Sequence, residues 1–308
     1  MPTLRAMIDQ RFVITPDLIT RDGDKHFNRG LHNQDSSVRA RVFYLFHRFI
    51  KEVRNEISLD LAASLLDNIR DLLSIQVDLP ELESPETQDL LTEAIKNPGI
   101  FDSQIYLFET AGILTSLFFR DSTQSETFLS SIVKPLMNDL PGNLQAAKAS
   151  NDVTAVLKIH HIIMALGNVA KGFPDLPSPL PGGYILPPLE LFREIGQAIL
   201  VCLEQLNIVK GIRDAVRFTS FYFHSNANQP DSWKTRFAFA RIVAPTGSSI
   251  TDLIPPLMAN LLAHSEPSEL ADFMNFIGLL VHRLKVSESE LGKVILTRLL
   301  FRILWSKF

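Results

Sequence analysis

One segment, residues 33–57, constrains the fold of this chain more than any other. Its sequence, NQDSSVRARVFYLFHRFIKEVRNEI, places apolar side chains at steps of three and four residues, which is the periodicity of an amphipathic α-helix. The apolar stripe consists of Val38, Val42, Phe46, Phe49, Ile50, Val53 and Ile57. Asp35 or Ser36 can accept the amide hydrogens of the first turn, so the helix is predicted to begin there. Because the stripe is continuous, the helix needs a neighbouring element to cover it.

An Asp followed by a Val-Arg pair and an amphipathic helix is typical of one helix of a HEAT-type repeat, and Asp35, Val38 and Arg39 fit this pattern. Almost all of the sequence has helical periodicity, and no segment alternates convincingly as a β-strand does. Helices are predicted over 36–57, 59–74, 102–120, 126–140, 153–171, 187–206, 208–223, 250–263, 268–284 and 287–305. Antiparallel helix pairs repeated at about 40 to 47 residues are typical of HEAT or armadillo arrays. We therefore predict an all-α fold, a HEAT-repeat superhelical solenoid in which each repeat contacts mainly its neighbours.

Composition is consistent with a folded intracellular protein. The chain has 308 residues, of which 46% are hydrophobic, enough for a substantial core. No apolar run reaches the roughly 18 to 20 residues that cross a bilayer, and the amino terminus lacks a secretory-type apolar segment. The single cysteine, Cys202, excludes a disulfide framework or a cysteine-based zinc site within the chain. A reducing compartment and no membrane insertion are therefore expected.

Net charge limits the kind of nucleic-acid binding that is plausible. A formal net charge of −4 and a pI of about 6.1 argue against a protein that coats nucleic acid indiscriminately. The charge is unevenly spread, however, because residues 76–98 are acidic whereas the helix at 36–57 has an excess of basic residues. A local basic surface on an acidic body is therefore still possible.

Several segments interrupt the predicted helical array of residues 33–308. We interpret 76–98 as an acidic loop and 173–187, FPDLPSPLPGGYILP, as a loop in which prolines and paired glycines end the helices. Residues 217–235 fit no helix face, and Arg217-Phe218 recurs as Arg236-Phe237. Removing this segment joins GIRDAV to RFAFARIV as one amphipathic helix. We interpret it as an insertion, either a retained short intron in the gene model or a natural loop.

Both ends of the chain differ from complete repeats. Residues 1–32 do not form a recognisable first repeat. The last predicted helix ends in an apolar cluster with no polar capping repeat after it: Leu299, Leu300, Phe301, Ile303, Leu304 and Trp305. Solenoids normally shield such a face. We therefore predict that the solenoid is truncated at both ends.

The sequence gives no support for an enzyme, a metal site or a cofactor. His160 and His161 are adjacent, so on a helix they point about 100° apart and cannot readily chelate one ion. We expect them to pack in the core or to make a polar contact between helices. The segment 21–30 lacks the ligand spacing of a calcium loop, and Gly182-Gly183 does not introduce a helix as a phosphate-binding loop does. No Walker, H-E-x-x-H or G-x-S-x-G motif is present.

Three segments together resemble one known family. NQDSSVRARVFYLFHRFIKEV, FDSQIYLFETAGIL and AVLKIHHIIMALGNVAKGF are similar to successive pieces of the fungal tRNA exportins, exportin-T, in the family's order and spacing. GIRDAV with RFAFARIV continues the resemblance, which covers roughly 31–305. It implies a karyopherin of the importin-β class that binds tRNA with Ran-GTP, passes nucleoporins and shuttles between nucleus and cytoplasm. By this resemblance the chain is much shorter than a full exportin, and we expect it to lack the repeats that form the principal Ran-binding arch.

The face of the 36–57 helix opposite the stripe is the predicted RNA-binding site. It carries Arg41, Tyr44, Arg48, Lys51 and Arg54. Each cation could pair with a phosphate, and the phenol ring could donate a hydrogen bond or stack on a base. The alternative interpretation is a solvated helix face with no partner. Arg39 is expected to be structural, paired with an acidic residue such as Asp35.

Two further charged groups have alternative interpretations. Arg213, Arg217, Lys234, Arg236 and Arg241 form a second basic group. The acidic loop at 76–98 could contact a basic partner such as Ran, or it could be a hydrated linker. The competing function is a HEAT scaffold that binds proteins and never contacts RNA. Such a scaffold should expose aromatic and aliphatic anchors, whereas a tRNA-binding wall should expose separated cations.

Overall fold

The computed structural model describes residues 29–81, 89–177, 179–217 and 238–264, together with 266, 269, 273–278 and 280. These parts of the chain contain helices and no β-strand, so the predicted all-α fold is confirmed. The α-helices are α4 (Ser36–Val53), α5 (Leu59–Ile69), α6 (Leu90–Lys96), α7 (Phe101–Ser116), α8 (Ser122–Ser150), α9 (Val153–Lys171), α10 (Leu189–Leu206), α11 (Lys210–Arg217), α12 (Ala238–Thr246) and α13 (Ile254–Ala263). Short 3-10 helices follow α5 at Arg70–Leu73 and precede α13 at Gly247–Leu253.

Polar side chains define where several of these helices begin. Asp35 precedes α4 and accepts hydrogen bonds from the amides of Ser37 and Val38, as the sequence predicted. Asp121 and Asp152 cap α8 and α9 in the same way. A cap of this kind contributes about 1 kcal/mol, because it satisfies amides that have no partner within the helix. The starting residues are thus fixed by local sequence.

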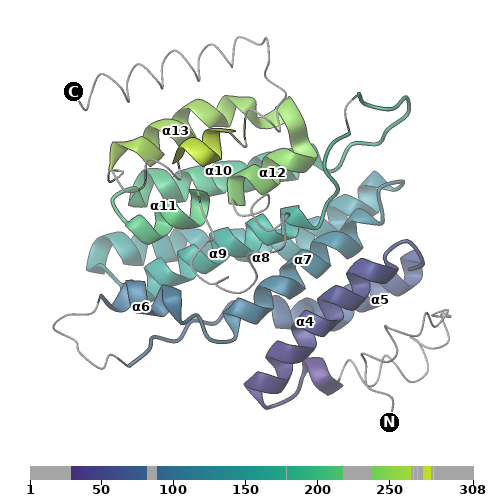
Figure 1. Cartoon of the computed structure of the whole chain (residues 1–308), viewed down its shortest axis with the longest axis horizontal. Helices are drawn as coiled ribbons and strands as arrows, with labels where there is room; N and C mark the ends of the chain where they lie inside the picture. Colours follow the sequence, from purple (N-terminus) through teal and green to yellow (C-terminus); the bar gives the residue numbers. More distant parts are fainter. Residues whose placement is uncertain are drawn as a thin grey trace.

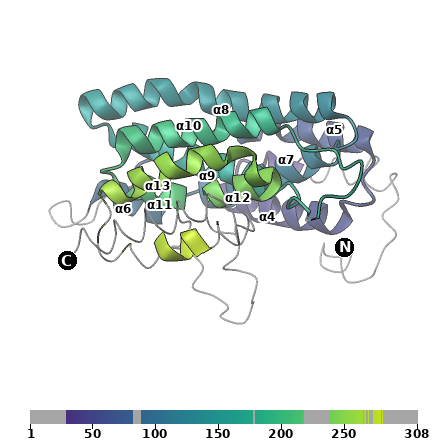
Figure 2. The same ribbon diagram turned by 90° about the horizontal axis from the view of Figure 1, so that it is seen from above.

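The helices form two layers, as expected for a HEAT-type solenoid (Figures 1 and 2). In one layer α4 packs on α7, α7 on α9, and α9 on α12. In the other layer α10 packs between α8 and α13, while α5 packs against α7. Neighbours in sequence are therefore neighbours in space, so each helix pair is stabilised mainly by the next pair.

Close contact between helices of the first layer depends on glycine. A Cβ atom on Gly112 of α7 would lie 2.0 Å from the carbonyl oxygen of Val169 in α9. A Cβ atom on Gly172, just after α9, would lie 2.4 Å from the amide nitrogen of Ile113. No larger side chain fits at either position without moving a backbone. These glycines allow α7 and α9 to approach more closely than helices usually do.

Helix α9 is the centre of the core. It contacts α7, α8, α10, α11 and α12, and most of its side chains are buried, including Ile159, Ile163 and Leu166. Contrary to the sequence prediction, α9 is long and apolar enough to cross a membrane by length and composition alone. Its 83% burial inside the protein instead identifies a core helix.

A polar side chain in the first helical turn recurs at three of the repeats. Arg39 of α4 donates to the carbonyl oxygens of Asn33 and Gln34, and Arg213 of α11 donates to those of Asn207 and Ile208. Gln104, at the equivalent position of α7, donates to the carbonyls of Leu72 and Ser74. Arg39 and Arg213 therefore satisfy carbonyl oxygens just before their own helices, whereas Gln104 satisfies those at the end of the 3-10 helix that follows α5.

This arrangement corrects the predicted partner of Arg39. The structural role of Arg39 agrees with the prediction, but its guanidinium donates to backbone carbonyls, and within the described part of the chain it makes no ion pair with Asp35. The carboxylate of Asp35 is instead occupied in capping α4. The sequence could not distinguish these partners, because all of them lie within six residues of Arg39.

Three elements differ from the sequence prediction. Helix α6 lies inside the segment interpreted as an acidic loop and packs against α9. Helix α8 continues ten residues past its predicted end at 140, because Pro135 and Pro141 are exposed and water can hydrate the carbonyls they leave unpaired. Helix α12 occupies a segment for which no separate helix was predicted.

The remaining sequence predictions concern the loop at 173–187 and three segments that the structure does not describe. Residues 173–177 and 179–187 contain no helix, Gly183 has a positive φ, and the amide of Tyr184 donates to the carbonyl of Pro181. The amino-terminal segment 1–28, most of the predicted insertion at 217–235 and the last predicted helix lie outside the described residues.

Candidate nucleic-acid interface

The predicted RNA-binding residues share one face of α4, which we call the basic face. Its members are Arg41, Tyr44, Arg48, Lys51 and Arg54, of which the four cations are exposed and the tyrosine is partly buried. The opposite side of α4 buries Phe43, Phe46, His47, Ile50 and Val53. The buried face therefore includes Phe43 and His47, whereas Val38, predicted to be part of the apolar stripe, is exposed.

Tyr44 is the centre of the basic face. The guanidinium groups of Arg41 and Arg48 lie 5.6 Å and 6.0 Å from the centroid of its ring, within cation–π range. The ring also makes an edge contact with Tyr106 of α7, at a centroid distance of 5.3 Å. Tyr44 therefore keeps the two arginines on the same side of α4. This contact reduces the freedom that they would lose on binding a ligand.

Lys51 differs from the two arginines because it belongs to a charged cluster. Its ammonium nitrogen lies 3.7 Å from a carboxylate oxygen of Glu109 on α7. The other carboxylate oxygen of Glu109 accepts a hydrogen bond of 2.6 Å from Lys171, at the end of α9. Glu109 is only 4% exposed, whereas Lys171 is 26% and Lys51 is 55% exposed. The carboxylate thus lies beneath two lysines from different helices.

The electrostatics of the cluster follow from burial and these neighbours. Burial raises the pKa of Glu109, but Lys171, His47 and Lys51 together outweigh it, so the pKa lies below its ordinary value. Burial lowers the pKa of His47 to about 4, although Glu109 acts in the opposite direction. At neutral pH Glu109 is therefore ionised and His47 is uncharged. Neutral His47 contacts the Thr110 hydroxyl at 3.2 Å.

A pocket of about 480 Å³ opens above this carboxylate, and we call it the Glu109 pocket. Its wall comes from the carboxyl ends of α4, α7 and α9, from the residues that follow α9, and from α12. The charged and polar lining residues are Lys51, Arg54, Asn55, Glu109, Ser116, Lys171, Asp175 and Arg241. The basic face of α4 thus continues at its carboxyl end into a concave site.

Sequence reasoning missed two main residues of this pocket, Glu109 and Lys171. Glu109 is a lone acid within the apolar segment IYLFETAGIL, and that isolation is the signal that could have marked it. Lys171 ends α9 without any distinguishing pattern. Only the packing of α4, α7 and α9 brings these residues to Lys51.

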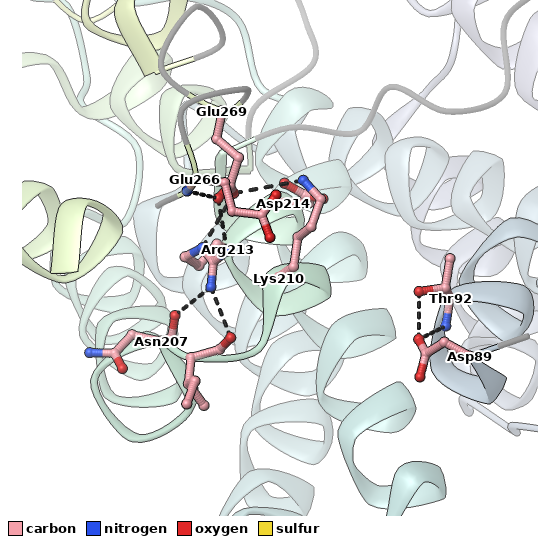
Figure 3. Close-up of polar contacts among 9 residues, drawn as sticks. Asp89, Thr92, Asn207, Lys210, Arg213, Asp214, Glu266 and Glu269 are labelled. Carbon is pink, nitrogen blue, oxygen red and sulfur yellow. Dashed lines mark hydrogen bonds and ion pairs between the residues drawn. The ribbon is translucent and has the colours of Figure 1, made fainter. Parts of the chain in front are cut away.

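The predicted second basic group is not one surface. Arg213 is 2% exposed and forms a buried ion pair with Glu269, at 2.8 Å (Figure 3). Arg241 lines the Glu109 pocket, and burial lowers its pKa to about 10. The side chain of Arg217, and all of Lys234 and Arg236, lie outside the described residues. Arg213 is therefore structural, and Arg241 joins the site around α4.

The adjacent histidines of α9 pack in the core, as predicted. The ring of His161 stacks on Phe101 of α7 at a centroid distance of 3.8 Å, and its Nδ1 lies 3.1 Å from Nδ1 of His160. Burial lowers the pKa of His160 to about 4, and burial together with His160 lowers that of His161 to about 2. Both rings are neutral at physiological pH.

A two-layered array of packed helix pairs is typical of a HEAT-type helical-repeat protein. The family model of Exportin-T matches residues 12–225 and 233–306. The chain belongs to the Exportin-T family. Only 226–232 of the predicted insertion at 217–235 lie outside this match, so the insertion remains a prediction.

Individual relatives agree with this assignment. The chain is 54% identical over 286 residues to Exportin-T of Laccaria bicolor and 49% identical over 287 residues to that of Coprinopsis cinerea. Both alignments cover 92% of this chain and 23% of the relative. Exportin-T of Mycosarcoma maydis is 34% identical over 260 residues, covering 83% of this chain and 22% of the relative. The chain thus spans about a quarter of the length of these curated relatives.

Proposed function

We propose that this chain is the tRNA-contacting part of a nuclear export receptor for tRNA. In this proposal the receptor acts with Ran-GTP, passes nucleoporins and shuttles between nucleus and cytoplasm. Membership of the Exportin-T family supports the proposal. The observation that carries it is the basic face of α4, whose four exposed cations lie on the layer formed by α4, α7, α9 and α12.

The spacing of the basic face suits a nucleic-acid backbone. Arg41 and Lys51 are ten residues apart, which is about 15 Å along a helix, so they would contact different phosphates. The major groove of A-form RNA is too deep and narrow for side chains to read, so contacts to phosphates and 2′-hydroxyls dominate. Separated cations are typical of such a surface, whereas a protein-binding site would centre on exposed apolar anchors.

The test is tRNA binding by the purified chain over a salt series, with and without Ran-GTP. The informative variant is Arg41→Ala with Arg48→Ala, because both side chains are exposed and each contacts the ring of Tyr44. We expect tRNA affinity to fall, and the slope of log affinity against log salt to decrease by about two. The loss should be similar for different tRNA species, because phosphate contacts carry no sequence information.

The matched control is Lys148→Ala, an exposed cation in the last turn of α8, in the other layer. It should bind tRNA as the wild type does. A loss confined to one tRNA species would contradict phosphate contact by the basic face. Absence of tRNA binding by a folded wild-type chain would favour the protein-binding scaffold instead. Stronger binding with Ran-GTP would indicate that part of the Ran interface lies in this chain.

A further inference from the structure

The Glu109 pocket has an excess of positive charge. Its lining contains four basic side chains, Lys51, Arg54, Lys171 and Arg241, and two carboxylates, Glu109 and Asp175, a formal excess of two positive charges. The carboxyl ends of three helices also meet here, each with a partial charge of about −0.5. These helix ends offset most of the excess but not all of it. The pocket should therefore favour an anion, with modest affinity and strong salt dependence.

Glu109 is already neutralised, which excludes a cation as the occupant. Its two carboxylate oxygens face Lys171 at 2.6 Å and Lys51 at 3.7 Å. A metal ion could bind this carboxylate only by displacing both ammonium groups. The lysines, by contrast, retain donors for another acceptor, because an ammonium group has three N–H donors and Lys51 is too far from Glu109 for a hydrogen bond.

The position of these donors suits a group with several acceptor oxygens. Lys51 and Lys171 come from α4 and α9, on either side of Glu109, and Arg54 lies one turn beyond Lys51. Phosphate accepts charge-assisted hydrogen bonds from several donors at once. The pocket volume of about 480 Å³ is within the usual range for small-molecule sites, so a phosphate with an attached sugar would not be too large.

We propose that the Glu109 pocket binds one phosphate group, with Lys51, Lys171 and Arg54 as donors and Glu109 as the residue that positions the two lysines. The phosphate could belong to an RNA backbone or could be free in solution, since both present the same oxygens. The RNA source rests on the proposed function. Binding of free phosphate does not depend on the proposed function, so separate measurements distinguish free phosphate from an RNA phosphate.

The first measurement uses inorganic phosphate and the thermal unfolding midpoint, Tm. Adding phosphate in place of sodium chloride at constant ionic strength should raise the Tm of the wild type by roughly 3 °C at a tenfold excess over Kd. The variant Lys51→Gln with Arg54→Gln should lose this rise. Both side chains are exposed, so this variant should fold. The control Lys148→Gln should keep the rise. An equal rise in all three proteins would overturn the proposal.

The second measurement is the salt dependence of tRNA binding by the same proteins. If the phosphate is that of RNA, Lys51→Gln with Arg54→Gln should lower the salt slope by about two, and inorganic phosphate should compete with tRNA in the wild type. If the variant loses the Tm response but binds tRNA normally, the pocket takes free phosphate and the RNA source is excluded. If the wild type binds no tRNA but keeps the phosphate response, the proposed function fails and the phosphate site stands.

Discussion

Glu109 is a single ionised residue within a buried helix face, and its neighbours explain why the fold tolerates it there. A buried carboxylate is costly unless it is paired and hydrogen-bonded. Lys171 provides the hydrogen bond and Lys51 a second cation, each from a different helix. Glu109 therefore links α7 to α4 and α9 while it positions the lysines of the pocket.

We expect Glu109→Gln to lower the free energy of unfolding by roughly 2 to 3 kcal/mol, because Lys171 loses its partner in a partly buried site. The loss should be smaller than for a fully buried pair, since part of Lys171 reaches solvent. Urea denaturation at pH 7 measures the difference. The control is Glu194→Gln, which breaks an exposed pair with Lys134 and should cost less than about 1 kcal/mol. Equal losses in the two variants would contradict the role of Glu109.

Buried histidines should make stability depend on pH between 7 and 5. Folding lowers the pKa values of His47 and His160 to about 4 and that of His161 to about 2, whereas unfolded histidine titrates near 6.5. Below pH 6.5 the unfolded chain therefore binds protons that the folded chain does not, so stability falls as pH falls. Each histidine should account for about 2 kcal/mol between pH 7 and pH 5.

His161→Phe tests this pH dependence, because phenylalanine can keep the stack on Phe101 but cannot titrate. The free energy of unfolding of the variant should fall by about 2 kcal/mol less than that of the wild type between pH 7 and pH 5. Urea denaturation at both pH values gives the comparison. An unchanged pH dependence would mean that His161 is protonated in the folded state.

At the scale of elements, the contact between α7 and α9 depends on Gly112. Its missing side chain leaves room for the Val169 carbonyl, which a Cβ atom would meet at 2.0 Å. We expect Gly112→Ala to lower the free energy of unfolding by roughly 3 kcal/mol or more, because two backbones would have to separate. Gly142 of α8 is the control, since nothing lies within 4 Å of its Cβ position.

Gly142→Ala should stabilise α8 by up to about 1 kcal/mol, because alanine loses less backbone entropy than glycine in a helix. Urea denaturation of Gly112→Ala and Gly142→Ala therefore tests the same substitution at two sites. The free energy of unfolding should fall in the first variant and rise in the second. If both variants were destabilised by similar amounts, the close packing of α7 and α9 would not be the reason why position 112 requires glycine.

At the scale of the whole molecule, a destabilising substitution in one repeat of the solenoid should lower the stability of the adjacent repeats only. Each repeat contacts mainly its neighbours, so the stability of one repeat depends little on a distant one. The buried pair of Arg213 and Glu269 links α11 to residues beyond α13 (Figure 3). Helix α11 lies away from α4 and α5 in the array (Figure 1).

Arg213→Met should leave Glu269 buried without its guanidinium partner and the carbonyls of Asn207 and Ile208 without theirs. Hydrogen exchange followed by mass spectrometry should then show faster exchange in α10, α11 and α13 and unchanged exchange in α4 and α5. Lys210→Met removes an exposed contact to the same carboxylate, so it should change exchange little. Faster exchange throughout the Arg213→Met chain would contradict the local behaviour of a solenoid.

Local sequence was sufficient for much of the fold. The period of the apolar residues identified helices, a capping aspartate marked where α4 begins, and prolines with paired glycines marked the loop at 173–187. These features depend on residues within one or two turns of each other. The extension of α8 through Pro141 was not predicted, because it depends on which side of the helix faces solvent.

The sequence by itself determined the helical class, the repeat type and the basic face of α4, since one helix places Arg41, Tyr44 and Arg48 on the same side. Tertiary structure alone decided which charges meet. Glu109 and Lys171 are 62 residues apart, and only the close packing of α7 on α9 joins them. Arg213, which the sequence placed in a second basic group, is buried because α11 packs on α9 and α10 and its guanidinium pairs with Glu269. Charge pairing acts across space, so a pattern along the chain cannot reveal it.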